Sequence, residues 1–236
     1  MTQIIPTAEP FFFPGSGQNA RIGCLVQHGF TGTPKEMRWM GEYLNKKGFT
    51  VCGMRLAGHA TKPDHMIRSR KEDWLATIED GYHLLNSCCE KVFLLGLSMG
   101  GILALTMAGK LPVAGVVAMS TPFQLPPDPR LKYLKIISFF IPYLAKGKDK
   151  PGSGWFDMEV WKQHVAYPQN PMRSIAELNQ LLELMRQTLP LVKVPVLLIH
   201  SRDDDYVIKD SMDSIYNLLG SPDKEKLWVS GGGHVI

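Results

Sequence analysis

Six short apolar runs, rich in valine, isoleucine and leucine, recur along this chain and restrict the folds open to it. Their apolarity is continuous rather than alternating, which is typical of strands covered on both faces. Helical segments separate the runs, so the pattern predicts an α/β fold with a mostly parallel sheet flanked by helices. The runs are Ile22 to Gln27, Thr50 to Met54, Val92 to Leu97, Val113 to Met119, Val194 to His200 and Glu225 to Val229.

One connection is far too long for an ordinary crossover. More than seventy residues separate Met119 from Val194. The chain has 236 residues, 44% of them hydrophobic, which suffices for one α/β domain over residues 1–236. We therefore expect a subdomain inserted within that domain, over residues 122–190. Its aromatic residues fit extra core or a hydrophobic lid, and the edge formed by Lys132 and Lys135 also fits a membrane-surface helix.

Local sequence signals mark the helices between the runs. Thr33-Pro34-Lys35-Glu36 and Ser174-Ile175-Ala176-Glu177 both have the pattern of a capping box, so each predicts a helix N-terminus. The first helix is expected to end near Gly48 and the second before Pro190. Further helices are predicted over Asp73 to Asn86, with Trp74, Ile78 and Leu85 inward, over Met99 to Lys110 and over Asp210 to Leu219.

Charge and cysteine content exclude several classes of protein. The net charge is only +4 and the basic residues are scattered, which argues against a nucleic-acid groove. Four cysteines are too few for a disulfide scaffold; Cys24 and Cys52 lie in apolar runs and are predicted to be buried thiols. No spacing indicates a metal site. Without a signal-peptide pattern or a membrane-length apolar run, we expect a cytoplasmic protein with no stable membrane anchor.

The segment Gly96-Leu97-Ser98-Met99-Gly100 joins one predicted strand directly to a predicted helix. A turn this tight brings the residues beside the serine against neighbouring backbone, so glycine is needed on both sides. Ser98 is then exposed at the carboxyl end of a central strand. The position predicts a nucleophile, and a serine nucleophile needs a histidine base, a carboxylate that orients the histidine, and donors for an oxyanion.

The base is best supplied by His234, which follows the last predicted strand in a glycine-rich loop. Parallel strands bring their carboxyl ends to one edge of a sheet, so this loop and Ser98 are expected to meet there. His65, His83 and His164 have no strand-end position and are expected to be surface or packing residues. His200 lies inside an apolar strand end.

The acid and the oxyanion donors have candidates at the same edge. Ser201 to Val207 follows a strand and presents three adjacent carboxylates, Asp203, Asp204 and Asp205, of which at most one needs a catalytic role. His28-Gly29-Phe30-Thr31-Gly32 follows the first parallel strand, where glycine allows close backbone approach. The amides of Phe30 and Met99 are the candidate oxyanion donors.

Together these motifs resemble the α/β-hydrolase superfamily, and more narrowly its small bacterial carboxylesterases and monoacylglycerol lipases. The resemblance runs from about Phe11 to Ile236 and is weaker over residues 122–193. In that family a valine or isoleucine follows the acid by three residues, which matches Asp204 with Val207 and favours Asp204 over its neighbours. The family's oxyanion positions correspond to Phe30 and Met99.

The resemblance implies hydrolysis of short- to medium-chain carboxylic esters, monoacylglycerols included, without a cofactor. A thioesterase, lactonase or perhydrolase would use the same triad, and a non-catalytic binding protein on the same fold is a further alternative. Relatives usually continue into a final helix after the histidine, whereas this sequence has two residues after His234. The histidine loop is therefore expected to be prone to disorder.

Overall fold

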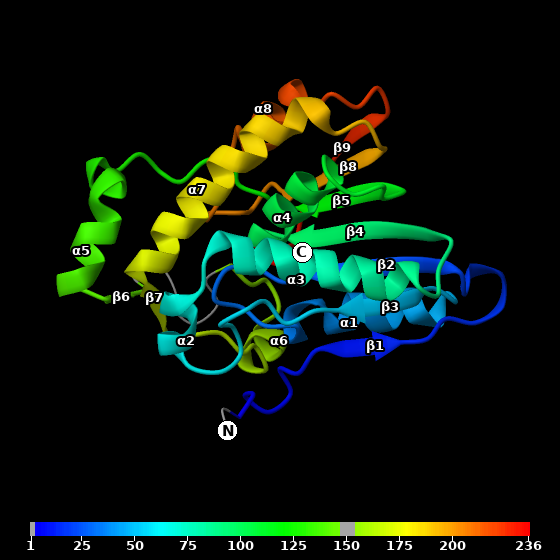
Figure 1. Cartoon of the computed structure of the whole chain (residues 1–236), viewed down its shortest axis with the longest axis horizontal. Helices are drawn as coiled ribbons and strands as arrows, with labels where there is room; N and C mark the ends of the chain where they lie inside the picture. Colours follow the sequence, from blue (N-terminus) through cyan, green and yellow to red (C-terminus); the bar gives the residue numbers. More distant parts are fainter. Residues whose placement is uncertain (1–2, 147–153) are drawn as a thin grey trace.

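A seven-stranded sheet forms the centre of the computed structural model, which describes residues 3–146 and 154–236 (Figure 1). The strand order is β1-β3-β2-β4-β5-β8-β9, and every pair is parallel except β1 with β3. The predicted mostly parallel sheet is therefore confirmed. The strands are β1 Phe11–Phe13, β2 Ile22–Gln27, β3 Thr50–Gly53, β4 Lys91–Leu97, β5 Gly115–Met119, β8 Val196–Ser201 and β9 Lys224–Val229.

All six apolar runs are strands, and β1 is an additional edge strand that the sequence analysis did not predict. It is only three residues long and antiparallel, so the sequence contains no long apolar run that would predict it. The Phe11 ring lies where side chains on Gly41 and Gly53 would otherwise be, since a Cβ on either glycine would come within 2.7 Å of that ring. These two glycines allow β1 to pack against α1 (Lys35–Lys46) and β3.

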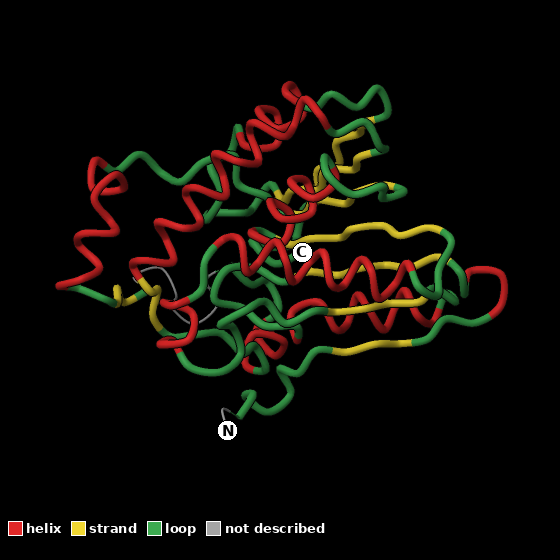
Figure 2. Tube along the Cα trace, in the orientation of Figure 1, coloured by secondary structure: helices red, strands yellow, loops and turns green. Residues whose placement is uncertain are grey.

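Helices cover both faces of the sheet, as Figure 2 shows. On one face α1 packs over β1, β2 and β3; on the other lie α3 (Lys71–Asn86) and α4 (Met99–Ala108). As predicted, Trp74, Ile78 and Leu85 of α3 are buried in the larger of the two cores. Every residue of α4 is buried, because α3 and the long helix α7 (Met172–Thr188) pack on either side of it. The remaining helix of the core is α8 (Ser211–Leu218).

Both predicted capping boxes are wrong. No side chain caps α1, and the Thr33 hydroxyl is buried without a hydrogen-bond partner among the described residues. Glu36 turns away from the helix and accepts a hydrogen bond from the Gly29 amide at 3.0 Å. Helix α7 begins two residues before Ser174, whose hydroxyl donates to the Met66 carbonyl at 2.9 Å. Glu36 thus has a donor from another loop, and Ser174 an acceptor from another helix, in place of the partner within its own helix.

The long segment between β5 and β8 divides into two parts. Its C-terminal part, α7, belongs to the core, where Leu181, Leu182 and Met185 are fully buried. Its N-terminal part extends beyond the sheet at the left of Figure 1. Its elements are η2 Pro129–Tyr133, α5 Leu134–Phe140, β6 Tyr143–Ala145, α6 Met158–Lys162 and β7 Gln169–Pro171, and β7 contacts α2. The short helix α2 itself spans Pro63–Arg68.

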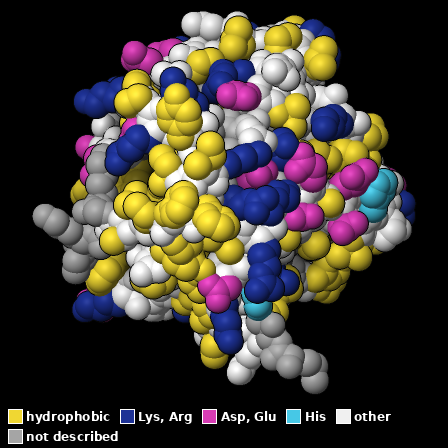
Figure 3. All heavy atoms as spheres, turned by 60° about the vertical axis from the view of Figure 1, so that its left-hand side comes forward, with side chains coloured by type: hydrophobic (Ala, Val, Ile, Leu, Met, Phe, Trp, Pro, Cys, Tyr) yellow, Lys and Arg dark blue, Asp and Glu magenta, His cyan; other side chains and the backbone are white. Residues whose placement is uncertain are grey.

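Helix α5 leaves a large apolar surface uncovered. Phe139 and Phe140 are 84% and 76% exposed, and Ile136 and Ile141 are also exposed. Figure 3 shows hydrophobic side chains gathered on this side of the molecule with lysine and arginine beside them. No helix in the described part of the chain is long and apolar enough to cross a membrane.

The four cysteines are free and differ sharply in accessibility. Burial raises the pKa of Cys24 to about 12 and that of Cys52 to about 11, in agreement with the predicted buried thiols. Cys89 is buried as well, and only Cys88 is exposed. Because the thiolate is the reactive form, we expect one fast-reacting thiol per native chain with a disulfide reagent at pH 8. Cys88→Ser should abolish the fast phase; a fast phase that survives this substitution would contradict the burial of the other three.

Candidate active site

Ser98 lies on the sharp turn between β4 and α4, in a backbone conformation that residues with side chains rarely adopt. Its φ is 56° and its ψ is −117°. The flanking glycines make the turn possible: a Cβ on Gly96 would come within 2.1 Å of the Gly100 backbone, and one on Gly100 within 2.2 Å of the Gln27 carbonyl oxygen. Any side chain at either position would push α4 away from the sheet. The sequence prediction of this turn is confirmed.

The loop after β2 lies directly against the serine. A Cβ on Gly29 would stand 3.3 Å from the Cβ of Ser98, so glycine permits this close approach. The Gly29 amide donates to Glu36, and the next amide, that of Phe30, has no acceptor within the described residues. The Met99 amide, at the first position of α4, also lacks an acceptor there. Two unsatisfied amides therefore flank the serine, as an oxyanion hole requires.

Asp204 and His234 form a hydrogen-bonded pair. Nδ1 of His234 lies 2.9 Å from Oδ2 of Asp204, and both side chains are largely buried. The other carboxylate oxygen of Asp204 accepts from the amides of Tyr206 at 2.8 Å and Val207 at 3.1 Å. Burial alone would raise the pKa of Asp204, but the hydrogen bonds from His234 and the two amides outweigh it and hold that pKa below its usual value. Asp204 is thus ionised and fixed.

The neighbouring carboxylates are arranged differently. Asp203 is exposed and accepts a hydrogen bond from the Gly231 amide at 3.0 Å, and Asp205 is exposed. Of the three candidates, only Asp204 is buried and in contact with the histidine.

The His234 loop is held from several sides, contrary to the expectation of a disordered end. Gly233 packs so tightly against the backbone of Gly154 that a Cβ there would come within 2.5 Å of it. The Val235 amide donates to the Gly154 carbonyl at 3.0 Å. The ring of Tyr206 stacks on that of His234, with 5.2 Å between the ring centroids. The inserted segment and the acid turn therefore fix the position of the histidine.

A cavity of about 790 Å³ opens over the serine. Ser98, Phe30 and His234 all line it, so three of the five predicted site residues share one cavity. Asp204 lies behind His234, and the side chain of Met99 is buried in the core. The inserted segment contributes much of the remaining lining, including Leu125, Leu144, Trp155, Trp161, Tyr167, Ile175 and Leu178.

Glu36 and His164 line the cavity, although the sequence analysis placed neither of them in the site. His164, expected to be a surface or packing residue, lies on the cavity wall with its Nε2 3.5 Å from Oε1 of Glu36. Glu36 was predicted to be a helix cap. No local pattern distinguishes either residue, because they meet only when the inserted segment folds over the sheet edge.

The other strand-end histidines are structural. His28 is fully buried: its Nδ1–H donates to the Gly29 carbonyl and its Nε2 accepts from the Leu56 amide, and burial lowers its pKa well below the usual value. His200 accepts from the Thr121 amide at 3.1 Å, and burial lowers its pKa to about 4. Both are neutral at physiological pH. They support loops around the site without supplying a base.

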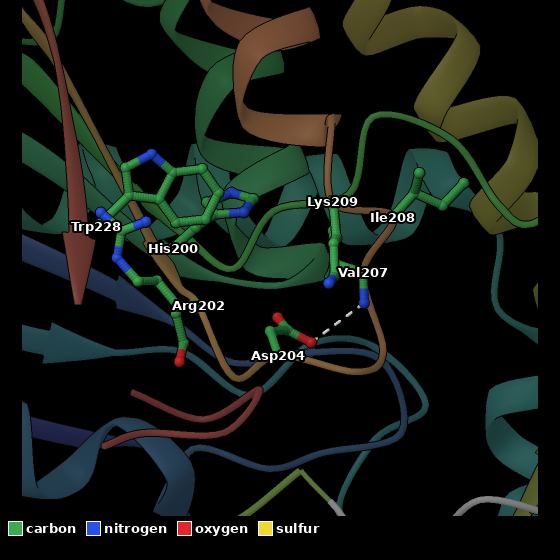
Figure 4. Close-up of a pocket in the computed structure, with 8 residues that line it drawn as sticks. His200, Arg202, Asp204, Val207, Ile208, Lys209 and Trp228 are labelled. Carbon is green, nitrogen blue, oxygen red and sulfur yellow. Dashed lines mark hydrogen bonds between the residues drawn. The ribbon is translucent and has the colours of Figure 1, made fainter. Parts of the chain in front are cut away.

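A second, smaller cavity of about 210 Å³ lies on the other side of Asp204 (Figure 4). His200 and Trp228 form one wall, and Arg202 lies over the Trp228 ring. Figure 4 also shows the hydrogen bond from the Val207 amide to Asp204, which lies across the cavity from Trp228. This cavity is separate from the serine, and its walls are the packing that surrounds the acid turn.

A parallel α/β sheet with a serine on a strained strand-to-helix turn, beside an aspartate–histidine pair, defines a serine hydrolase of the α/β-hydrolase fold. The chain belongs to the family Hydrolase_4, described as serine aminopeptidase, S33, whose model matches residues 18–236.

Named relatives agree with this assignment. The chain is 32% identical over 243 residues to a thermostable monoacylglycerol lipase of Bacillus sp. (strain H-257), covering 98% of this chain and 88% of the relative. It is 28% identical over 233 residues to a carboxylesterase of Bacillus subtilis (strain 168), covering 98% and 90%. A solved structure reported for the metagenome-derived lipolytic enzymes LipS and LipT superposes with a TM-score of 0.87 at 36% identity, covering 99% of this chain and 91% of that one.

Proposed function

We propose that this chain is a serine carboxylesterase whose triad is Ser98, His234 and Asp204. The observation that carries the proposal is a single apolar cavity faced by a serine on a strained turn and by a histidine paired with a buried aspartate. The relatives named above, a carboxylesterase and a monoacylglycerol lipase, support ester bonds as the substrate. No cofactor is needed for this chemistry.

The mechanism follows from the positions of these groups. His234 takes the proton of Ser98 as its oxygen attacks the ester carbonyl, and the amides of Phe30 and Met99 donate to the oxyanion. The protonated imidazole then gives its proton to the leaving alcohol, which leaves an acyl group on Ser98. A water molecule activated by His234 releases the acid. Asp204 accepts from Nδ1–H throughout and stabilises the imidazolium form.

The part of the inserted segment that precedes α7 acts in this proposal as a cap over the serine, while α7 itself belongs to the core. Its leucines and aromatic residues form most of the apolar lining, which suits an acyl chain. A volume of about 790 Å³ is within the usual range for small-molecule sites. We infer a preference for short- to medium-chain esters, monoacylglycerols included. The free thiols suit a reducing compartment, so we place the enzyme in the cytoplasm.

The proposal is tested by initial rates on p-nitrophenyl esters with acyl chains of two to sixteen carbons. We expect turnover to peak at short or medium chains and to fall for the longest ones, because a cavity of about 790 Å³ limits the length of the acyl chain that it can hold. A fluorophosphonate should label Ser98 covalently. Absence of both turnover and labelling would favour a non-catalytic binding protein, the last of the alternatives named above.

Other acyl-transfer activities remain alternatives with the same triad. The rates of thioester hydrolysis, lactone hydrolysis and peracid formation are compared with the rate of hydrolysis of an ester with the same acyl group. Cleavage of prolyl p-nitroanilide tests the aminopeptidase activity that the family description names. Faster cleavage of any of these than of the matched ester would replace the carboxylesterase assignment.

A further inference from the structure

Tyr167 connects the inserted segment to two loops of the core. It follows α6, and it is only 3% exposed because it packs against the larger core. Its hydroxyl donates to the Gly58 carbonyl at 2.7 Å and accepts from the Thr61 amide at 2.9 Å. Its own amide donates to the Thr31 carbonyl at 3.1 Å. One residue of the inserted segment is therefore bonded both to the loop before α2 and to the loop after β2.

The contact with Thr31 falls on a strained residue beside the proposed oxyanion donor. The φ of Thr31 is 61°, a left-handed conformation that a β-branched residue rarely adopts. Its hydroxyl donates to the Phe30 carbonyl at 2.6 Å, and its carbonyl accepts from the Tyr167 amide. Strain of this kind persists only where the surroundings impose it. Without the Tyr167 contact, Thr31 would relax towards an ordinary conformation and turn Phe30 with it.

The amide of Phe30 lies between two anchors. On one side, the Gly29 amide donates to Glu36 at 3.0 Å. A Cβ on Gly29 would stand 3.3 Å from the Cβ of Ser98, so this part of the loop lies against the proposed nucleophile. On the other side, Tyr167 holds Thr31. The first anchor belongs to the core and the second to the inserted segment, so the direction of the Phe30 amide depends on both.

The hydroxyl of Tyr167 secures the second anchor. A tyrosine hydroxyl has one proton to donate, which Gly58 receives, and Thr61 occupies its acceptor side through the amide and, at 3.3 Å, the hydroxyl. The loop that it binds is held in turn by Trp74, whose Nε1–H donates to the Ala57 carbonyl at 3.2 Å. Loss of the hydroxyl would leave the Gly58 carbonyl and the Thr61 amide without this partner. The position of Tyr167 therefore depends on its hydroxyl.

We propose that Tyr167 is a positioning residue for the oxyanion hole, which is complete only while the inserted segment is seated on the loop before α2. This inference rests on the proposed function. The hydroxyl of Tyr167 holds the residue in place, its amide holds Thr31, and Thr31 sets the direction of the Phe30 amide. Acylation and deacylation each form an oxyanion, so both steps depend on this chain of contacts. The inserted segment thus sets the catalytic geometry as well as lining the cavity.

The test uses Tyr167→Phe, which keeps the ring and the backbone amide and removes only the hydroxyl. We expect kcat for p-nitrophenyl octanoate to fall roughly 10- to 100-fold, the loss typical of a misplaced oxyanion donor. KM should stay within about twofold of the wild-type value, because the hole acts on the oxyanion rather than on the bound ester. Rates are expressed per site that a fluorophosphonate labels, so an unfolded fraction does not lower them.

Two ketones with the same heptyl chain separate this role from a merely structural one. With a trifluoromethyl ketone, the Ser98 oxygen bonds to the carbonyl carbon, its proton passes to His234, and the carbonyl oxygen becomes an oxyanion in the hole. The corresponding methyl ketone binds without this addition. In Tyr167→Phe the affinity for the trifluoromethyl ketone should fall by the same factor as kcat/KM, while the affinity for the methyl ketone stays unchanged.

Tyr82→Phe is the matched control, since it removes another tyrosine hydroxyl from a buried residue. The Tyr82 hydroxyl donates to Asn86 within α3 at 3.4 Å, and Tyr82 is not among the residues that line the cavity. This variant should keep kcat and both ketone affinities within about twofold of the wild type.

Two results would overturn the proposal. One is an unchanged affinity of Tyr167→Phe for the trifluoromethyl ketone, even if thermal stability falls. The other is an equal loss of affinity for both ketones, because Tyr167 would then only shape the cavity. A wild-type enzyme that hydrolyses the ester while Tyr167→Phe is equally active refutes this inference alone, whereas a wild-type enzyme inactive on every ester refutes the proposed function.

Discussion

Ser98→Ala should reduce kcat for p-nitrophenyl butyrate by about 10⁶-fold, the largest effect expected of any single substitution in this chain. Without the hydroxyl no acyl-enzyme forms, and only the oxyanion donors and binding remain to accelerate direct attack by water. The substitution removes one atom from a residue that lines the cavity, so the fold should persist. The measurement is single-turnover hydrolysis with circular dichroism as the check on folding.

Two comparisons make this prediction specific. Ser87→Ala, at an exposed position after α3, should leave turnover within about threefold of the wild type. The double variant Ser98→Ala/His234→Ala should be no slower than Ser98→Ala alone, because members of a triad act as a unit and their losses do not add. Retention of more than a hundredth of the wild-type kcat in Ser98→Ala would refute the proposed nucleophile.

Most of the sheet was predictable because its strands are buried on both faces. Leu94 and Leu95 of β4 enter opposite cores, so the sequence shows a continuous apolar run where a one-sided sheet would show alternation. The edge strand β1 lacks this signal. The short strands β6 and β7 of the inserted segment were also missed, because their pairing depends on where that segment folds back rather than on their own residues.

The arrangement at the serine was predictable where the chain itself forces it. Gly96 and Gly100 are required by backbone contacts within one turn, and the acid and histidine loops follow neighbouring strands, so topology alone brings them to one sheet edge. Glu36 and His164 have no such constraint. Thr33 and Glu36 fit a helix cap by spacing, but the Gly29 amide competes for the carboxylate, and only tertiary structure decides between the two.

Asp204→Asn should lower kcat by about 10⁴-fold while leaving the fold intact. The remaining oxygen at this position still accepts from the Tyr206 and Val207 amides, which keeps the turn in place. The new amide group, however, presents N–H to Nδ1 of His234, where the carboxylate had accepted a hydrogen bond from Nδ1–H. Nδ1 must then be unprotonated and the proton resides on Nε2. An imidazole in that tautomer has no lone pair to take the proton from Ser98.

The adjacent carboxylates supply matched controls for this argument. Asp203→Asn and Asp205→Asn make the same chemical change one residue away on exposed side chains, and each should stay within about threefold of the wild-type kcat. Thermal unfolding should show Asp204→Asn to be folded at the assay temperature. If instead Asp203→Asn or Asp205→Asn caused the large loss and Asp204→Asn did not, the hydrogen bond between Asp204 and His234 would not be the one that orients the base.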